Sequence, residues 1–182
     1  MSELAARATV PAIGRSIETQ EVYVEHLRAK RAIGDLSCDL CAAVSRQERL
    51  DLYPEIDGKP FVLTNEYFAL VVNDYPYFAY DGQEVKAHHM LLPREHIGSR
   101  ALLLDRFWRN AQADARSEIE ELTNGFYHAD LRRSSSSPAS SIRAHDHTHL
   151  FRFGRPVVAQ HFSIEQRKND IAFSQVAPTN RR

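Results

Sequence analysis

The segment "HDHTH" at residues 145–149 carries an imidazole at every second position. Successive side chains of a β-strand point to opposite faces, so a strand would place all three rings on one face, about 6.5–7 Å apart. The pattern therefore predicts a strand over residues 142–153. The aspartate and threonine between the histidines are expected on the reverse face of that strand, which they would leave hydrated.

The remaining patterns predict an α+β fold with a mainly antiparallel sheet of about five strands. A helix is expected over residues 16–33, with Ser16 or Thr19 as its N-cap and Gly34 just past its end. Runs of β-branched and aromatic residues predict further strands at 61–65, 67–74, 87–93, 125–133, 156–166 and 169–175, with 75–86 as a loop. Because these strands cluster and no long βαβ alternation appears, the sheet is expected to be antiparallel.

A second and longer helix is predicted over residues 99–123. Its apolar positions recur at intervals of three and four, at Leu104, Trp108, Ala111, Ala115, Ile119 and Leu122. The pair Asn124-Gly125 supplies a signal for the helix end. We expect this helix to cover one face of the sheet with its apolar stripe.

The composition is that of an ordinary globular protein, with 43% hydrophobic and 26% charged residues. No apolar run approaches the roughly 20 residues that span a bilayer. Charged residues at Glu3, Arg7 and Arg15 interrupt the segment where a secretory signal would be apolar. We therefore expect a cytoplasmic protein that does not bind a membrane. The net charge of −1 and the dispersed Lys and Arg argue against a nucleic-acid polymer as partner.

Three chemical readings of the alternating histidines remain open at this point. They are solvated strand residues, ligands of a divalent metal ion, or a nucleophile with its supporting imidazoles acting on phosphorus. The two cysteines, Cys38 and Cys41, form the motif "CDLC". In a reducing compartment this spacing suggests a metal clip or a redox pair more than a structural disulfide.

Two motifs taken together resemble the histidine-triad family of nucleotide hydrolases and transferases. The first is "HHMLLPREHI" at residues 88–97, and the second is the segment from His145 to Phe151, with a long helix between them. The resemblance covers residues 36–153 and implies a histidine-triad-like domain at 36–176. Residues 1–35 are then an N-terminal helical extension, and 177–182 a frayed tail.

The resemblance implies a role for each histidine. His147 matches the family's nucleophile, which attacks the α-phosphate to form a covalent nucleotidyl intermediate that water resolves. His149 matches the histidine on the phosphate and leaving-group side, and His145 the one that supports the others. His88 matches the upstream histidine that lies against the nucleophile's ring. A backbone carbonyl fixes the tautomer of the nucleophile in the family.

Substrate contacts are also implied by the resemblance. Asn73, with Asp74 as the neighbouring alternative, matches the residue that binds the ribose hydroxyls. Apolar residues of the preceding strand, such as Phe68 and Leu70, would line the base pocket. The family's glycine- and glutamine-containing phosphate loop is replaced here by "RRSSSSPASSIRAH". Ser140 or Ser141 would donate a hydroxyl to the phosphate there, and Arg143 would supply positive charge.

A structural zinc site follows from the resemblance to bacterial members with a Cys-x-x-Cys motif. Its four ligands would be Cys38, Cys41, His96 and His145. Two thiolates and two imidazoles are the donors expected of a closed tetrahedral site. No organic cofactor is expected.

The sequence thus predicts a nucleoside phosphoramidase or dinucleoside polyphosphate hydrolase acting on a purine nucleotide, and a homodimer by resemblance. One alternative is a nucleotidylyltransferase or phosphorylase of the same superfamily, against which His149 argues because those sites generally carry glutamine at that position. A second is a nucleotide-binding or sensing module without turnover. A third is a metalloenzyme that uses His145, His147 and His149 as zinc ligands.

Overall fold

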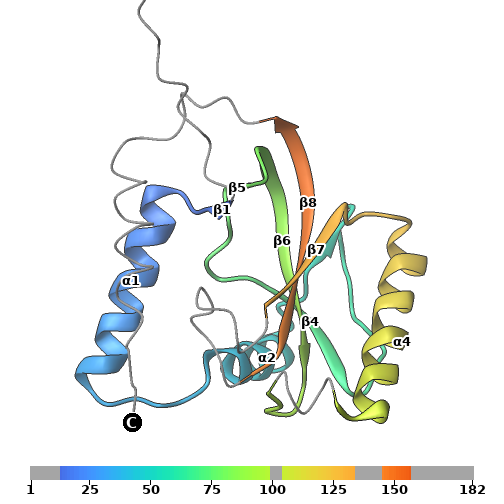
Figure 1. Ribbon diagram of the computed structural model, residues 1–182, viewed down its shortest axis with the longest axis horizontal. Coiled ribbons are helices and arrows are strands. Elements are labelled where there is room, and N and C mark those ends of the chain that lie inside the picture. The colour runs from blue at the N-terminus through green and yellow to red at the C-terminus, as the bar shows by residue number, and fades with distance from the viewer. Residues whose placement is uncertain (1–12, 99–103, 134–144, 157–182) are drawn as a thin grey trace, which may run out of the picture.

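The computed structural model describes residues 13–98, 104–133 and 145–156. Within these ranges the chain forms three helices and a mainly antiparallel sheet, so the α+β prediction is confirmed (Figure 1). The strands predicted at 156–166 and 169–175, the first residues of the long helix, and the serine-rich loop lie outside the described residues, apart from Pro156.

The main sheet has six strands in the order β1-β5-β6-β8-β7, with β4 also pairing β6. Every pairing is antiparallel. The strands span Ile13–Gly14 (β1), Phe68–Val72 (β4), Ala79–Tyr80 (β5), Gln83–Pro93 (β6), Ala129–Arg133 (β7) and His147–Pro156 (β8). The two long strands, β6 and β8, lie side by side through the middle of the sheet (Figure 1). They carry the first and second histidine motifs respectively.

Strand β6 is longer than predicted, because part of residues 75–86 is a hairpin and not a loop. Asp81 and Gly82 both have positive φ, 47° and 73°, and reverse the chain between β5 and β6. An Asp-Gly pair favours this turn because both central residues need a left-handed backbone.

The prediction of a strand at 61–65 is wrong. A small separate hairpin, β2 (Glu55–Ile56) with β3 (Lys59–Pro60), ends just before it. In this segment, side chains accept hydrogen bonds from backbone N–H groups that a neighbouring strand would otherwise pair. Thr64 N–H donates to Glu118, and Asn65 Oδ1 accepts from the N–H groups of Tyr67 and Phe68. These local bonds compete with a sheet ladder.

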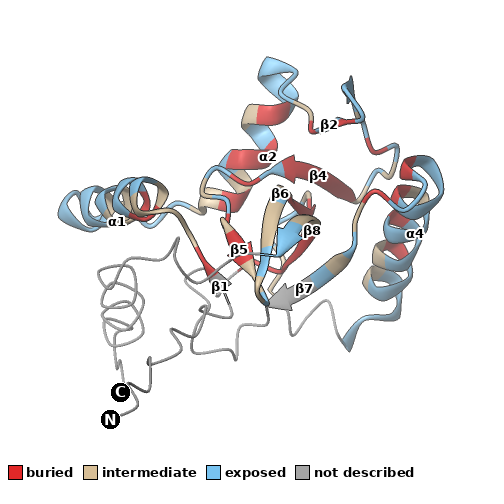
Figure 2. Ribbon diagram, turned by 90° about the horizontal axis from the view of Figure 1, so that it is seen from above, coloured by how far each residue is buried: buried red, intermediate tan, exposed pale blue. Residues whose placement is uncertain are grey.

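Helix α1 (Ile17–Ala32) confirms the first predicted helix, and Ser16 is its N-cap, with Oγ accepting from Thr19 N–H at 3.2 Å. Gly34 follows its end with a φ of 65°. Of its residues only Gln20 and Tyr23 are buried, and the helix lies to one side of the sheet (Figures 1 and 2). It is attached by a few specific contacts described below.

Helix α2 (Asp39–Leu50) was not predicted. It begins directly after Cys38 and packs Leu40, Ala43 and Val44 against the sheet. The sheet residues of this cluster are Ala69, Val71, Met90 and Leu92, from β4 and β6. One face of the sheet is therefore covered by α2.

Helix α4 (Arg106–Thr123) covers the opposite face of the sheet (Figure 2). Ala111, Ala115 and Ile119 are buried there as predicted, against Phe68, Leu70, Leu91 and Leu150. Leu104 and Leu122, also assigned to the stripe, are instead 73% and 61% exposed, and Thr123 takes the buried position near the end. The helix ends at Asn124 in a left-handed conformation. None of the described helices combines the length and the apolar content needed to cross a membrane.

Candidate functional site

The pairing of β6 with β8 brings the histidines of the two motifs together. His88 lies opposite Phe151 and Met90 opposite His149, so His88 and His149 are diagonal neighbours on one face. Their ring centroids are 4.9 Å apart, and those of His147 and His149 are also 4.9 Å apart. All three side chains are buried. The reading of these histidines as solvated strand residues is therefore wrong, and we refer to His88, His147 and His149 as the histidine array.

Backbone and ring contacts set the tautomers of His88 and His149. The N–H of Tyr77 donates to His88 Nδ1 at 3.0 Å, so that nitrogen carries no proton and His88 is protonated at Nε2. His88 Nε2 lies 2.8 Å from His149 Nδ1 and donates to it. His149 is consequently a neutral ring with its proton on Nε2, where it serves as a hydrogen-bond donor.

His147 has the opposite tautomer. Its Nδ1 lies 3.2 Å from the carbonyl oxygen of His145, and a carbonyl only accepts, so Nδ1 carries the proton. The lone pair of the neutral ring is then on Nε2. The array thus combines, in adjacent rings, an imidazole with a lone pair on Nε2 and an imidazole with an Nε2–H donor, a pair of groups that displacement at phosphorus can use.

Aromatic side chains enclose the array. The ring of Tyr77 lies 4.8 Å from His88 and 5.7 Å from His149, and Phe151 lies 4.7 Å from His88. The guanidinium carbon of Arg15 lies over the Tyr77 ring, 4.7 Å from its centroid. Such packing limits the rotation of each imidazole and lowers the local dielectric, which strengthens the hydrogen bonds within the array.

Tyr77 was missed in the sequence. It contributes both a backbone donor and a ring to the array, yet in the sequence it is only one aromatic residue in a segment read as a loop. The Asp-Gly turn downstream was the available signal, because recognising the hairpin would have placed residues 77–80 beside β6.

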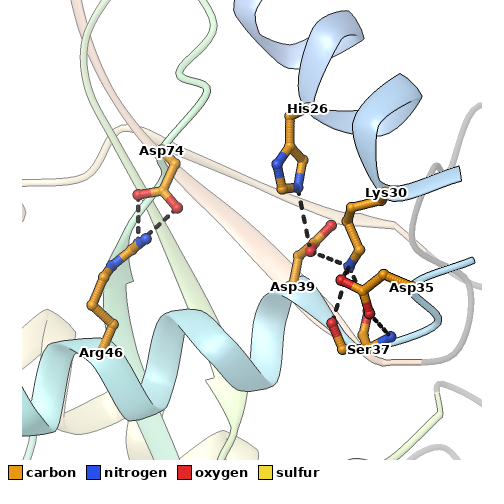
Figure 3. Close-up of polar contacts among 7 residues, drawn as sticks. All are labelled: His26, Lys30, Asp35, Ser37, Asp39, Arg46 and Asp74. Carbon is orange, nitrogen blue, oxygen red and sulfur yellow. Dashed lines mark hydrogen bonds and ion pairs between the residues drawn. The ribbon is translucent and has the colours of Figure 1, made fainter. Parts of the chain in front are cut away.

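Asn73 is buried and supports the array directly. Its Nδ2 lies 3.3 Å from His88 Nδ1, the ring nitrogen that accepts, and 3.1 Å from the protonated Nε2. Its Oδ1 accepts from Tyr75 N–H at 2.9 Å, and its own N–H donates to the His88 carbonyl. Asp74 accepts two hydrogen bonds from Arg46 of α2, both at 2.6 Å (Figure 3). The two residues therefore link the end of β4 to the array and to α2 respectively.

Two expectations about the surroundings of the site are wrong. Phe68 and Leu70, assigned to a base pocket, are fully buried in the core beneath α4. Asp146 and Thr148, expected on a hydrated reverse face, are also fully buried. Thr148 Oγ1 faces Gln112 of α4, and Asp146 N–H donates to the carbonyl of Ile97. Ser140, Ser141 and Arg143 lie outside the described residues.

The second functional cluster joins the cysteines to the two remaining predicted ligands. One potential ligand atom each from Cys38, Cys41, His96 and His145 lies within 4.8 Å of all the others. His145 Nδ1 is 3.4 Å from both sulfurs, and His96 Nδ1 is 3.3 Å from Cys41 Sγ. The predicted set is brought together and could hold a metal ion.

The geometry fits a tetrahedral ion. Metal–sulfur bonds of about 2.3 Å and metal–nitrogen bonds of about 2.0–2.1 Å separate sulfur from nitrogen by about 3.5 Å in a tetrahedron. The tautomer of His145 also fits, because Nε2 lies 3.0 Å from the carbonyl of Pro93 and donates to it, which leaves the lone pair on Nδ1 toward the sulfurs. A metal ligand needs this arrangement.

The two thiols have different proton affinities. Burial opposes ionisation of Cys38, but the contact with His145 and the N–H groups of Cys41 and Leu40 outweigh it and lower the pKa of Cys38 to about 6. Burial and the neighbouring Cys38 sulfur raise the pKa of Cys41 to about 11. The cluster thus already favours one thiolate, the ligand form of cysteine.

Helix α1 contacts the start of α2 beside this cluster and stabilises it. Lys30 donates to Asp39 and to the Ser37 carbonyl, both at 2.6 Å, and His26 lies 3.4 Å from Asp39 (Figure 3). Since Ser37 and Asp39 flank Cys38, these contacts restrain the backbone that carries the first cysteine.

The reading in which His145, His147 and His149 form one metal site does not match the geometry. His145 turns its Nδ1 toward the cysteines, whereas His147 and His149 lie in the array with His88. Among the described residues, the four-residue cluster is the one group of three or more such side chains close enough to hold an ion.

Comparisons with protein-family models, with curated proteins and with solved structures give no match to this chain. The functional argument therefore depends on the geometry of the two sites and on the motif resemblance.

Proposed function

We propose that the protein is a histidine-triad-type nucleotide hydrolase or transferase, which cleaves a nucleoside phosphoramidate or dinucleoside polyphosphate at the α-phosphate. The observation that supports this best is the pair of opposite tautomers in the array. His147 Nδ1 faces the His145 carbonyl at 3.2 Å, and His149 Nδ1 faces His88 Nε2 at 2.8 Å. These contacts put a lone pair on one Nε2 and a proton on the other.

The reaction follows from that arrangement. The lone pair of His147 Nε2 attacks the α-phosphorus, and the P–N or P–O bond breaks with its electron pair leaving on the amine or phosphate, which solvent protonates. His149 Nε2–H donates a hydrogen bond to the charge that develops there. His147 becomes a positively charged nucleotidyl-imidazolium, which the His145 carbonyl stabilises through Nδ1–H. Water then attacks phosphorus and loses a proton to solvent, the P–N bond to His147 breaks with its electron pair returning to Nε2, and the nucleoside monophosphate is released.

We propose that the metal held by Cys38, Cys41, His96 and His145 is a structural zinc ion. Four protein donors would complete a tetrahedral shell and leave no coordination position for a substrate. When bound, the ion would tie the start of α2 to His96, three residues after β6, and to His145, two residues before β8. A homodimer in a cytoplasmic setting completes the proposal.

The test is a mass measurement of the intact protein after mixing with a nucleoside phosphoramidate such as an adenosine 5′-phosphoramidate. We expect an adduct of one nucleoside monophosphate on the wild type, and we expect neither adduct nor product in His147→Ala. A matched control is His128→Ala, because this exposed histidine directly precedes β7 and its ring contacts the N–H and the side chain of Phe153. It should react like the wild type.

The outcomes separate the remaining candidates. Turnover that survives in a folded His147→Ala protein contradicts the nucleophile. Nucleotide binding without adduct or product in the wild type points instead to a non-catalytic binding module. Transfer of the nucleotidyl group to phosphate or to another nucleotide in preference to water points to the phosphorylase or transferase branch.

A further inference from the structure

Arg15 lies between β1 and α1, and it contacts both α1 and the segment that precedes β5. Its guanidinium carbon lies 4.4 Å from the centroid of the Tyr23 ring and 4.7 Å from that of Tyr77. Its Nε donates to the carbonyl oxygen of Tyr75 at 3.0 Å, and Nη1 approaches Gln20 Oε1 at 3.4 Å. Gln20 and Tyr23 are the two buried residues of α1. The buried face of α1 is therefore the face that contacts Arg15.

The segment from Tyr75 to Tyr77 connects Arg15 with the histidine array. Tyr77 N–H donates to His88 Nδ1 at 3.0 Å, and the Tyr77 ring lies 4.8 Å from the His88 ring. Tyr75 N–H donates to Asn73 Oδ1 at 2.9 Å. An N–H can bond only to a ring nitrogen that carries no proton. The position of this segment therefore influences which nitrogen of His88 is protonated.

Strand β1 fixes Arg15 and this segment relative to each other. Phe78 N–H donates to the carbonyl oxygen of Gly14 at 2.8 Å, and Gly14 pairs with Ala79 in the ladder of β1 and β5. The residue before Arg15 is thus bonded to the residue after Tyr77. Figure 1 shows that β1 joins α1 to the sheet beside β5. The N-terminal helix and strand are consequently attached to the part of the chain that contacts the array.

We infer that Arg15 is a positioning residue of the histidine array, an inference that rests on the proposed function only for its effect on catalysis. A guanidinium held between two aromatic rings and bonded to the Tyr75 carbonyl restrains the segment where Tyr77 N–H reaches His88. That hydrogen bond keeps the proton of His88 on Nε2, and this Nε2–H in turn sets the tautomer of His149. Arg15 acts on the array through Tyr77 and does not itself contact the substrate.

The experiment compares Arg15→Ala with Arg28→Ala, a control that removes an exposed arginine from α1. Two measurements need no substrate: hydrogen exchange of the Tyr77 amide, and long-range proton–nitrogen NMR of His88. In Arg15→Ala we expect the Tyr77 amide to exchange about three to ten times faster, the factor that corresponds to one net hydrogen bond. We also expect a measurable population of His88 protonated at Nδ1. Arg28→Ala should match the wild type in both measurements.

Kinetics on a nucleoside phosphoramidate add a third measurement. Arg15→Ala should lower kcat by about three to ten times and leave KM within about twofold, because the change affects the array and not the contacts that bind substrate. Arg15→Lys keeps a cation near the rings but lacks the planar set of donors, so it should change the exchange rate and kcat in the same direction by a smaller factor. If Arg15→Ala does not fold, this second variant carries the test.

An unchanged Tyr77 exchange rate with a single His88 tautomer in a folded Arg15 variant would overturn the inference, even if the melting temperature fell, because a purely structural role lowers stability alone. A rise in KM at constant kcat would also overturn it, since Arg15 would then contact the substrate. Failure of the proposed function gives a different result. The exchange and tautomer changes then appear as expected, which supports the role of Arg15, while the wild type forms neither adduct nor product.

Discussion

His88→Phe is the substitution that tests most directly which ring nitrogens of the histidine array carry protons. Phenylalanine keeps a planar ring against Tyr77 and Phe151 but has no nitrogen. The N–H of Tyr77 then loses its acceptor, and Nδ1 of His149 loses the donor that fixes its tautomer. The fold should survive, while the tautomer of His149 should no longer be unique.

The magnitude can be worked from the ring-nitrogen contacts that disappear, chiefly those with Tyr77 N–H at 3.0 Å and His149 Nδ1 at 2.8 Å, together with the approach of Asn73 Nδ2 at 3.1–3.3 Å. Each is worth about 1 kcal/mol net, and leaving the buried Tyr77 N–H without a partner costs about 1–3 kcal/mol more. The larger apolar ring offsets part of this loss. We expect the free energy of unfolding to fall by about 2–3 kcal/mol and, if the proposed reaction holds, kcat to fall about tenfold, which is about 1.4 kcal/mol in the barrier.

The assay is long-range proton–nitrogen NMR of the imidazole rings, which reports the protonated nitrogen whether or not the protein turns over a substrate. In the wild type we expect His88 and His149 to be protonated at Nε2 and His147 at Nδ1. In the variant His149 should populate both tautomers. His128, whose Nδ1 accepts from Phe153 N–H at 3.0 Å, is an internal reference that should not change. A wild-type His149 protonated at Nδ1, or an unchanged His149 in the variant, refutes the reasoning.

Three further predictions concern stability. Burial lowers the pKa of His89 from 6.5 to about 4, so its ring stays neutral in the folded chain where the unfolded chain binds a proton. The contribution of His89 to the free energy of unfolding should be complete above pH 6.5 and fall by about 3 kcal/mol as the pH drops toward 4. Denaturant titrations should show this pH dependence in the wild type and a weaker one in His89→Phe. A chelator should lower the melting temperature of the wild type but not that of Cys41→Ser, because this variant lacks one ligand and already resembles the metal-free wild type. Equal shifts in both proteins would contradict the metal centre. Phe151→Ala should destabilise the chain by about 3–5 kcal/mol, because this fully buried ring packs on both His88 and Tyr80, and a loss under 1 kcal/mol in urea unfolding would disagree with the packing described.

The sequence predicted elements where a local signal was strong. Helix α1 has a serine N-cap and a glycine past its end, and the buried part of α4 follows its 3.6-residue stripe. Helix α2 was not predicted because its N-cap is Cys38, whose side chain makes no capping hydrogen bond, and because its apolar face is short. At 61–65 tertiary contacts with Glu118 replaced the ladder that the residue types favoured.

For the site, residue types indicated which side chains matter but not how they are oriented. The four possible metal ligands were identified from their spacing and from a family resemblance, and they do come together. The register of β6 on β8 and the hydrogen bond from Tyr77 N–H to His88 depend on contacts between segments distant in sequence. Such contacts leave no periodic pattern that a single sequence can show.

His145 belongs to two centres at once. Its ring faces the cysteines, and its carbonyl oxygen holds the proton of His147. If the proposed function and metal site hold, metal binding at one centre and nucleotide binding at the other would be linked equilibria, and such linkage is reciprocal. An ion that orders His145 would then strengthen nucleotide binding by the same factor by which the nucleotide strengthens retention of the ion, so loss of the metal or oxidation of the two thiols would also lower the activity of the array.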